Sequence, residues 1–337
     1  RRDATELSAM LTHATVDADN AVRLAHQWLI TDPPQLVATH AGRRIGENLA
    51  AELEQRVIQL RRLDDHVGGG DLAVDVETEL ADTIQLLADA SYTENIGRRL
   101  LVVVGELAQL AGWTLSDAGA HQAAARAYMT GVHAAHAAED IPLAANLLSS
   151  MSYQVANVGK SADAVLLARS AERGAQHTAT PRTRALLADR VAWASARAGD
   201  SYGTERALDT ADEALDRANS AEDPDWVYWV GRDELDVMAG RCFTELRRPL
   251  KAEPLLSSVL GRYDASFARE RSLYLTWLAD AYVWAGEADQ AAATATEALE
   301  LAETVNSARA WDRVGIVADH LRGVRSPAVR EFIDRVR

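Results

Sequence analysis

The sequence has a single cysteine, Cys242, among its 337 residues. One cysteine cannot form an intramolecular disulfide, so packing and hydrogen bonds must hold the fold, and a reducing compartment is expected. No apolar run approaches the roughly eighteen residues that a membrane-spanning helix needs. The sequence therefore predicts a protein without a membrane span, located in the cytoplasm.

Basic residues are also scarce relative to acidic ones. There are 35 lysines and arginines against 50 aspartates and glutamates, for a net charge of −15. Such an excess of negative charge repels a phosphate backbone, so these residues are not expected to hold DNA by themselves. The opening Arg1-Arg2 is similar to a twin-arginine export signal, but Thr5, Glu6 and Asp17 interrupt the apolar core that such a signal requires.

A helical hairpin is predicted at residues 108–128. Small residues at Gly112 and Ala124 allow two helix backbones to approach closely, and Trp113 and Tyr128 supply the bulk that fills the space between them. This is the pattern of a tetratricopeptide (TPR) unit.

The same pattern recurs at a nearly fixed spacing. In every unit a small residue stands seven positions before a turn marker, and another stands five positions after it. The five markers are Gly119, Gly159, Gly199, Arg247 and Gly286, separated by 40, 40, 48 and 39 residues. An inserted loop at 221–225 explains the longest step. Five stacked hairpins are therefore expected, the fourth of them spanning Trp226–Leu260.

Apolar residues three or four positions apart predict further helices on both sides of the repeats. One is expected at 43–66, the next after Gly68-Gly69-Gly70 with Asp71 as its cap, and a third from Thr93. No period-two strand pattern appears, so we predict an all-α fold, a TPR-like α-solenoid of helical hairpins. The predicted parts are an N-terminal helical segment that packs on the array (1–92), five TPR-like hairpins (93–306) and C-terminal capping helices (307–337).

Four motifs carry a family resemblance. They are Leu63-Asp-Asp-His-Val-Gly-Gly-Gly70, Ala111-Gly-Trp-Thr-Leu-Ser-Asp-Ala-Gly119, Leu147-Leu-Ser-Ser-Met-Ser152 with Gly159, and Pro327-Ala-Val-Arg-Glu-Phe332. Together they resemble the sensor region of actinobacterial TPR transcriptional regulators, which carry an Xre-type helix-turn-helix. The resemblance covers roughly residues 40–337 and implies a homodimer that contacts DNA only through a helix-turn-helix, which is absent from this chain.

Two polar clusters could carry other chemistry. His133 and His136, with Glu139, could ligate a metal, but no third ligand with definite spacing is visible, and two exposed histidines are the plainer interpretation. Asp64 and Asp65 could hold magnesium, but no second acidic motif answers them. No His-Glu-x-x-His motif occurs. We therefore predict no enzyme activity, metal or cofactor.

The inner face of a TPR array is the better place for a ligand. Counting along the first helix of each unit gives the predicted ligand-binding residues Gln109, Trp113, Asp117, Asn146, Tyr153, Asn157, Asp189, Trp193, Arg197, Arg241, Asp280 and Trp284. Trp113, Tyr153 and Trp193 occupy one position in successive units, and so predict an aromatic ladder beside amides that can pair with a peptide backbone. The alternative is that the aromatic residues pack between helices and meet no ligand. The stretch 226–229 likewise either folds over the groove or packs in the core.

These observations predict the ligand-sensing or protein-interaction domain of a bacterial transcriptional regulator, which binds a peptide or small-molecule signal in its concave groove. The alternative is a constitutive protein–protein scaffold with no small ligand. A helical enzyme that uses Asp64 and Asp65 is a third hypothesis.

Overall fold

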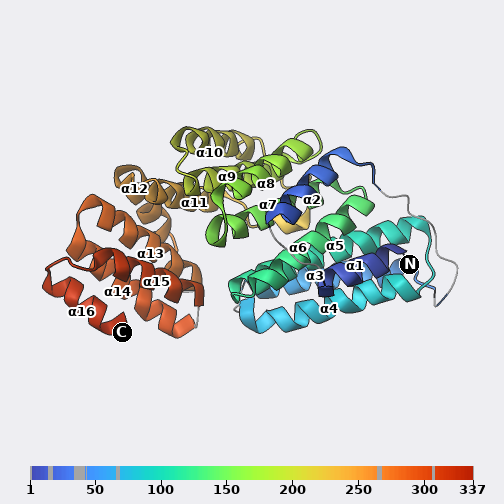
Figure 1. The fold of residues 1–337 in the computed structure, drawn as a ribbon, viewed down its shortest axis with the longest axis horizontal. Helices are drawn as coiled ribbons and strands as arrows, with labels where there is room; N and C mark the ends of the chain where they lie inside the picture. The colour runs from blue at the N-terminus through green and yellow to red at the C-terminus, as the bar shows by residue number, and fades with distance from the viewer. Residues whose placement is uncertain are drawn as a thin grey trace. The chain divides into compact units, whose positions relative to one another are not determined.

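The structure is a computed structural model that describes residues 2–13, 18–33, 42, 44–65, 69–263, 268–305 and 308–336. Within these residues the chain forms the α-helices α1 to α16 and one short 3-10 helix, η1, with no β-strand (Figure 1). The predicted all-α fold is confirmed.

Many helices pack on the next helix along the chain, most extensively α5 on α6, α13 on α14, α7 on α8 and α4 on α5. This is a solenoid-like arrangement, in which each hairpin buries its apolar face against the next. The helices are α1 (Arg2–His13), α2 (Ala18–Ile30), α3 (Glu47–Asp64), α4 (Gly69–Asp89), α5 (Glu94–Asp117), α6 (His121–Ala137), α7 (Ile141–Val158), α8 (Ser161–Ala175), α9 (Pro181–Arg197), α10 (Ser201–Leu215), η1 (Asp225–Val227), α11 (Arg232–Glu245), α12 (Pro249–Leu260), α13 (Ala268–Ala285), α14 (Ala288–Val305), α15 (Ala308–Leu321) and α16 (Pro327–Val336).

The chain divides into two compact units. Unit 1 comprises residues 1–194 and 210–229, and unit 2 comprises residues 195–209 and 230–337. Helices α9 and α10 each contribute residues to both units. The three-part division expected from the sequence follows repeat type rather than compactness, and it stays a prediction.

The first residue of a helix is set by a local capping residue in α5 and by burial of the apolar helix face in α4. Thr93 caps α5 as expected, with its hydroxyl accepting a hydrogen bond from the Ile96 amide at 3.4 Å. The predicted cap at Asp71 is wrong, because α4 already begins at Gly69. A glycine inside a helix costs only about 1 kcal/mol relative to alanine. Burial of Leu72 and Val76 on the apolar face of α4 offsets that cost.

The turn markers adopt the conformation that ends a helix in four of the five units. Gly119, Gly199 and Gly286 have φ angles of 80°, 74° and 83°, and Arg247 has the same left-handed conformation at 55°. This conformation turns the next amides back toward the last helical carbonyls, as where the Ala120 N–H donates to the Leu115 carbonyl at 2.8 Å. Gly159 differs, because it is extended with φ −123°.

Close approach of paired helices is confirmed at several glycines. A Cβ atom on Gly112 would lie 2.4 Å from the ring of Tyr128, which is 1% exposed. A Cβ on Gly240 would lie 2.6 Å from the Leu256 side chain. Both distances are too short for a real contact, so α5 with α6, and α11 with α12, are spaced for a residue that has no side chain.

Candidate functional site

Three aromatic rings from successive hairpins stack in unit 1. The ring centroids of Trp113 and Tyr153 are 5.9 Å apart, and those of Tyr153 and Trp193 are 6.2 Å apart, with the planes tilted by 31° and 36°. Helices α5, α7 and α9 supply one ring each, because a 40-residue step returns the chain to the same helix position. The predicted aromatic ladder is confirmed. We call the surface of α5, α7 and α9 that carries these rings the ladder face.

Burial increases along the ladder. Trp113 is half-buried, Tyr153 is buried and Trp193 is only 1% exposed. The Trp193 indole also donates a hydrogen bond to the Asn157 side-chain oxygen at 3.1 Å. A ligand on the ladder face would therefore meet the Trp113 end first, and Trp193 supports the fold through packing and this bond.

Side-chain amides lie beside the accessible end of the ladder. The Gln109 amide donates to the Ser150 hydroxyl across a long 3.5 Å, and Asn146 lies one turn before Ser150 on α7. Asn146 is 4% exposed, and its side chain makes no hydrogen bond among the described residues. Asp117 is half-buried and Asn157 is exposed at the other edge of the same face.

Arg190 is a residue of the ladder face that the sequence did not predict. It pairs with the predicted Asp189 at 2.8 Å, and both side chains are buried. Its guanidinium carbon also lies 4.8 Å from the Tyr153 ring centroid and 5.5 Å from that of Trp229. Arg190 follows Asp189 by one position, so counting inner-face positions passes over it, although Ser150 stands at the matching place in α7.

Part of the ladder face is covered by the chain itself. Glu106 occupies the position on α5 that Asn146 occupies on α7. Arg61 of α3, 6% exposed, donates to the Glu106 carboxylate at 2.8 Å and to Asp225 of η1 at 3.2 Å. Burial raises the pKa of Glu106, and the Arg61 charge opposes that rise.

The sequence left open whether the stretch 226–229 packs in the core or folds over the groove, and its residues divide between the core and the ladder face. It is not the start of a helix, because η1 ends at Val227 and α11 begins at Arg232. Trp226 is buried in the core. Trp229, by contrast, is 38% exposed and lies over Arg190 on the ladder face.

Tyr228 from the same stretch bonds to α3. The Arg62 guanidinium carbon lies 3.3 Å from its ring centroid, and its hydroxyl donates to the Asp65 carboxylate. Burial raises the pKa of Tyr228 to about 12. One carboxylate of the proposed magnesium pair therefore has a partner in the chain.

The other predicted ligand-binding residues lie in unit 2, where each makes an ion pair or a ring contact with another side chain. Arg197 pairs with Glu245, and the Arg241 guanidinium carbon lies 5.1 Å from the Trp277 ring centroid. Asp280, buried, binds Arg313 at 3.0 Å and His320 at 2.6 Å.

Trp284 contacts both His320 and Arg247: the Trp284 and His320 ring centroids are 5.1 Å apart, and the Arg247 guanidinium carbon lies 4.1 Å from the Trp284 ring centroid. Helix α15 supplies Arg313 and His320, which sequence reasoning missed because residues 307–337 were expected only to cap the array.

His133, His136 and Glu139, considered as possible metal ligands, do not converge, and the expectation of two exposed histidines is wrong because both are half-buried. Glu139 has a left-handed φ of 63° after the end of α6, and its carboxylate pairs with Arg98 at 2.8 Å. Across the described ranges, no group of three or more histidine, cysteine or carboxylate side chains could hold a metal ion. None of the helices in these ranges is both long and apolar enough to cross a membrane.

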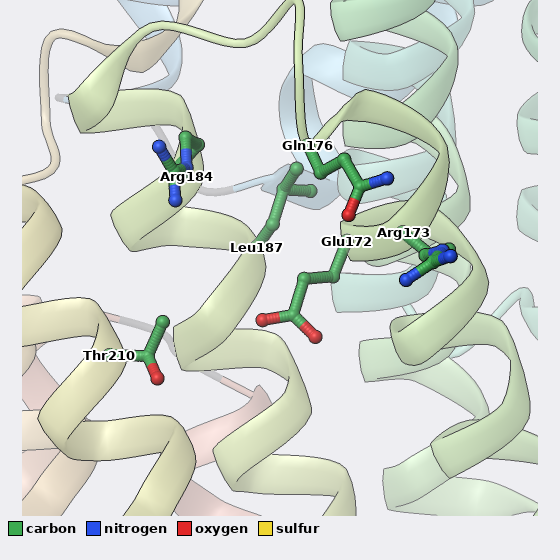
Figure 2. Close-up of a pocket in the computed structure, with 6 residues that line it drawn as sticks. All are labelled: Glu172, Arg173, Gln176, Arg184, Leu187 and Thr210. Atoms are coloured by element: carbon green, nitrogen blue, oxygen red, sulfur yellow. The ribbon is translucent and has the colours of Figure 1, made fainter.

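A hollow of about 220 Å³ lies elsewhere in unit 1, among α8, α9 and α10 (Figure 2). None of the predicted residues lines it. In Figure 2 the Glu172 carboxylate extends into the space between α8 and α9. The lining residues are Glu172, Arg173, Gln176, Arg184, Leu187 and Thr210.

The fold and this geometry define a class of protein. The chain is an all-helical, solenoid-like protein with an aromatic ladder on one face of its first unit. Comparison with protein-family models and with curated proteins finds no match for the chain. Function must therefore be inferred from the site.

Proposed function

We propose that the ladder face of unit 1 binds a peptide or small-molecule signal, and that the protein is a non-enzymatic sensor or interaction module. The observation that carries this proposal is the Asn146 amide, which is 4% exposed and makes no hydrogen bond among the described residues. Neither polar atom of this side chain is among the fully buried atoms without a partner, so the amide still reaches solvent, and a ligand that displaces water there can replace its hydrogen bonds.

The neighbours of Asn146 suit an amide-containing ligand. The Gln109 amide is held only by a 3.5 Å contact with Ser150, so it can turn toward a bound molecule. Trp113 offers a half-buried ring against which an apolar or aromatic group can pack. Amides that donate and accept together, beside an aromatic surface, match the chemistry of a peptide backbone.

The resemblance to actinobacterial TPR regulators supports a role in transcriptional control, with this region as the sensor. Any ligand would act by preferring one arrangement of the helices over another, and it can shift their populations only by that preference. DNA contact would then belong to a helix-turn-helix partner segment.

The test is a thermal-shift screen of the whole chain against a dipeptide-to-hexapeptide library and a metabolite library. For each hit, we expect Trp113→Ala and Asn146→Ala to abolish the shift. Trp311→Ala is the matched control, because Trp311 is a 39% exposed tryptophan on α15 in unit 2. Hits that shift Trp113→Ala and the wild type equally would remove the ladder face from the proposal.

A second candidate is a constitutive protein scaffold. It is favoured by the cover that Arg61 and Asp225 place over Glu106, because this cover reduces the ladder surface available to a ligand. This function predicts a protein partner whose binding affinity is the same with and without each compound found in the screen. Measuring complex formation with and without the best hit separates the two functions.

A further inference from the structure

Two N-terminal helices cover a pair of histidines on α6. His133 and His136 lie one turn apart and are half-buried. Helix α1 packs on both α4 and α6, and α2 packs on both α6 and α8 (Figure 1). We propose that α1 and α2 form a proton-sensitive cover, which leaves α4, α6 and α8 when His133 and His136 become charged.

Helix α1 buries Ala4 and Leu7 in the hydrophobic core of unit 1, whereas the apolar contact made by α2 is smaller. Helix α2 buries one face, formed by Ala21, Leu24, Ala25 and Trp28. Trp28 fits against Gly174 of α8 so closely that a Cβ atom there would lie 2.2 Å from the indole ring. Helix α2 has 13 residues, and helices of this length are marginal in water alone. Its position therefore depends on docking.

Burial lowers the pKa of His133, and the charge of His136 adds to this effect; the other groups that face the two histidines come from two places, α1 and the residues just after α2. Glu6 of α1 acts on His133, while Asp32 and a backbone hydrogen bond with Thr31, both just after α2, act on His136.

Two further charged groups lie near this surface. Arg126 of α6 donates to the Leu11 carbonyl of α1 at 3.1 Å, and Glu139 is engaged by Arg98. Burial outweighs the attraction of Glu6 and Asp32, and it lowers the pKa of both imidazoles below the ordinary 6.5.

This lowering fixes the direction of the switch. At about pH 7.5 and above both imidazoles are almost entirely neutral in either state, so docking changes little with pH. As the pH falls from 6.5 toward the lower docked pKa values, the undocked state binds protons that the docked state does not. Acidification therefore favours release. Between about pH 7.5 and about pH 5 the ratio of undocked to docked molecules rises by at most about 30-fold for each histidine.

Hydrogen–deuterium exchange of the full chain, corrected for the intrinsic pH dependence of exchange, measures this release. We expect the protection of amides in α1 and α2 to fall on acidification, by up to about 30-fold for each histidine, while α7 keeps its protection. The His133→Gln/His136→Gln variant should lose this pH dependence. His177→Gln, an exposed histidine in the turn after α8, is the matched control and should keep it.

Constant protection of α1 and α2 in the wild type, or an unchanged pH response in the double variant, would overturn the proposal. If α1 and α2 were undocked in the double variant at every pH, hydrogen exchange alone would not test the role of the histidines. An NMR titration of His136 in the wild type and in a second variant then tests it. In Gly174→Ala, where the added methyl group displaces Trp28, the His136 imidazole should titrate closer to 6.5 than in the wild type. An identical titration in the two proteins would show that α2 does not control this proton.

Discussion

Substituting Gly112 by alanine tests how tightly the first hairpin is packed. The new Cβ atom would lie 2.4, 2.5 and 2.7 Å from three carbon atoms of the Tyr128 ring. Non-bonded carbon atoms prefer about 3.5–4.0 Å, so α5 and α6 must separate by roughly 1 Å or the ring must move. Tyr128 is 1% exposed and surrounded by packed side chains, which leaves the ring little room.

Two opposing effects determine how much Gly112→Ala changes the free energy of unfolding. Overpacking of a well-packed core costs about 1–3 kcal/mol. Replacing glycine by alanine inside a helix returns up to about 1 kcal/mol. We therefore expect Gly112→Ala to lower the free energy of unfolding by about 1–2 kcal/mol. Gly315→Ala in α15 is the matched control, because no atom outside the local helix backbone lies within 4 Å of its added Cβ. It should raise the free energy of unfolding by about 0.5–1 kcal/mol.

Urea denaturation followed by circular dichroism measures both changes as shifts of the midpoint at constant slope. A double-mutant cycle then locates the cause: in a Tyr128→Leu background, Gly112→Ala should cost much less than in the wild type. The reasoning is refuted if Gly112→Ala is as stable as the wild type, or if its cost persists without the tyrosine ring.

Two further predictions concern polar contacts of unit 1. Trp193→Phe removes the 3.1 Å bond to Asn157, worth about 0.5–1.5 kcal/mol, and leaves a cavity beside the smaller ring that adds to the loss of stability in thermal melting. Asn157→Ala should add little on top of it, and fully additive costs would disprove the bond. Arg61→Met leaves Glu106 without its partner and should cost about 3 kcal/mol or more near pH 7. Because burial already raises the pKa of Glu106 above 4.5, this cost should shrink as the pH falls toward 4.5 and the carboxyl becomes neutral. Denaturation at about pH 7 and about pH 5 measures it, and a cost independent of pH would contradict the assignment.

Helix positions were predictable because short-range patterns specify them. The apolar spacing of α3 and the cap at Thr93 act within a few residues, and both features appear in the structure. The aromatic ladder was predictable for the same reason, since one repeat position recurs every 40 residues. Asp71 failed as a cap because burial of the α4 face overrode the local signal.

The remaining contacts of the site could not be predicted, because they join residues far apart in the sequence. Arg61 and Asp225 are separated by 164 positions, and no periodicity relates α3 to η1. Arg313 reaches Asp280 from a helix outside the repeats. In each case the partner lies on a non-repeated element, whose docking position depends on the whole fold.

Contacts with non-repeated elements also explain why ladder residues at equivalent repeat positions have different roles. The 40-residue step gives Trp113, Tyr153 and Trp193 the same place on their helices, yet their exposure decreases along the series. Neighbours outside the repeat pattern contribute to the difference, because Trp229 lies over Arg190, which in turn lies against Tyr153. A substitution at Trp193 must therefore affect folding before it affects any ligand. One at Trp113 can affect a ligand while leaving the fold intact, so only the Trp113 end can separate binding from stability.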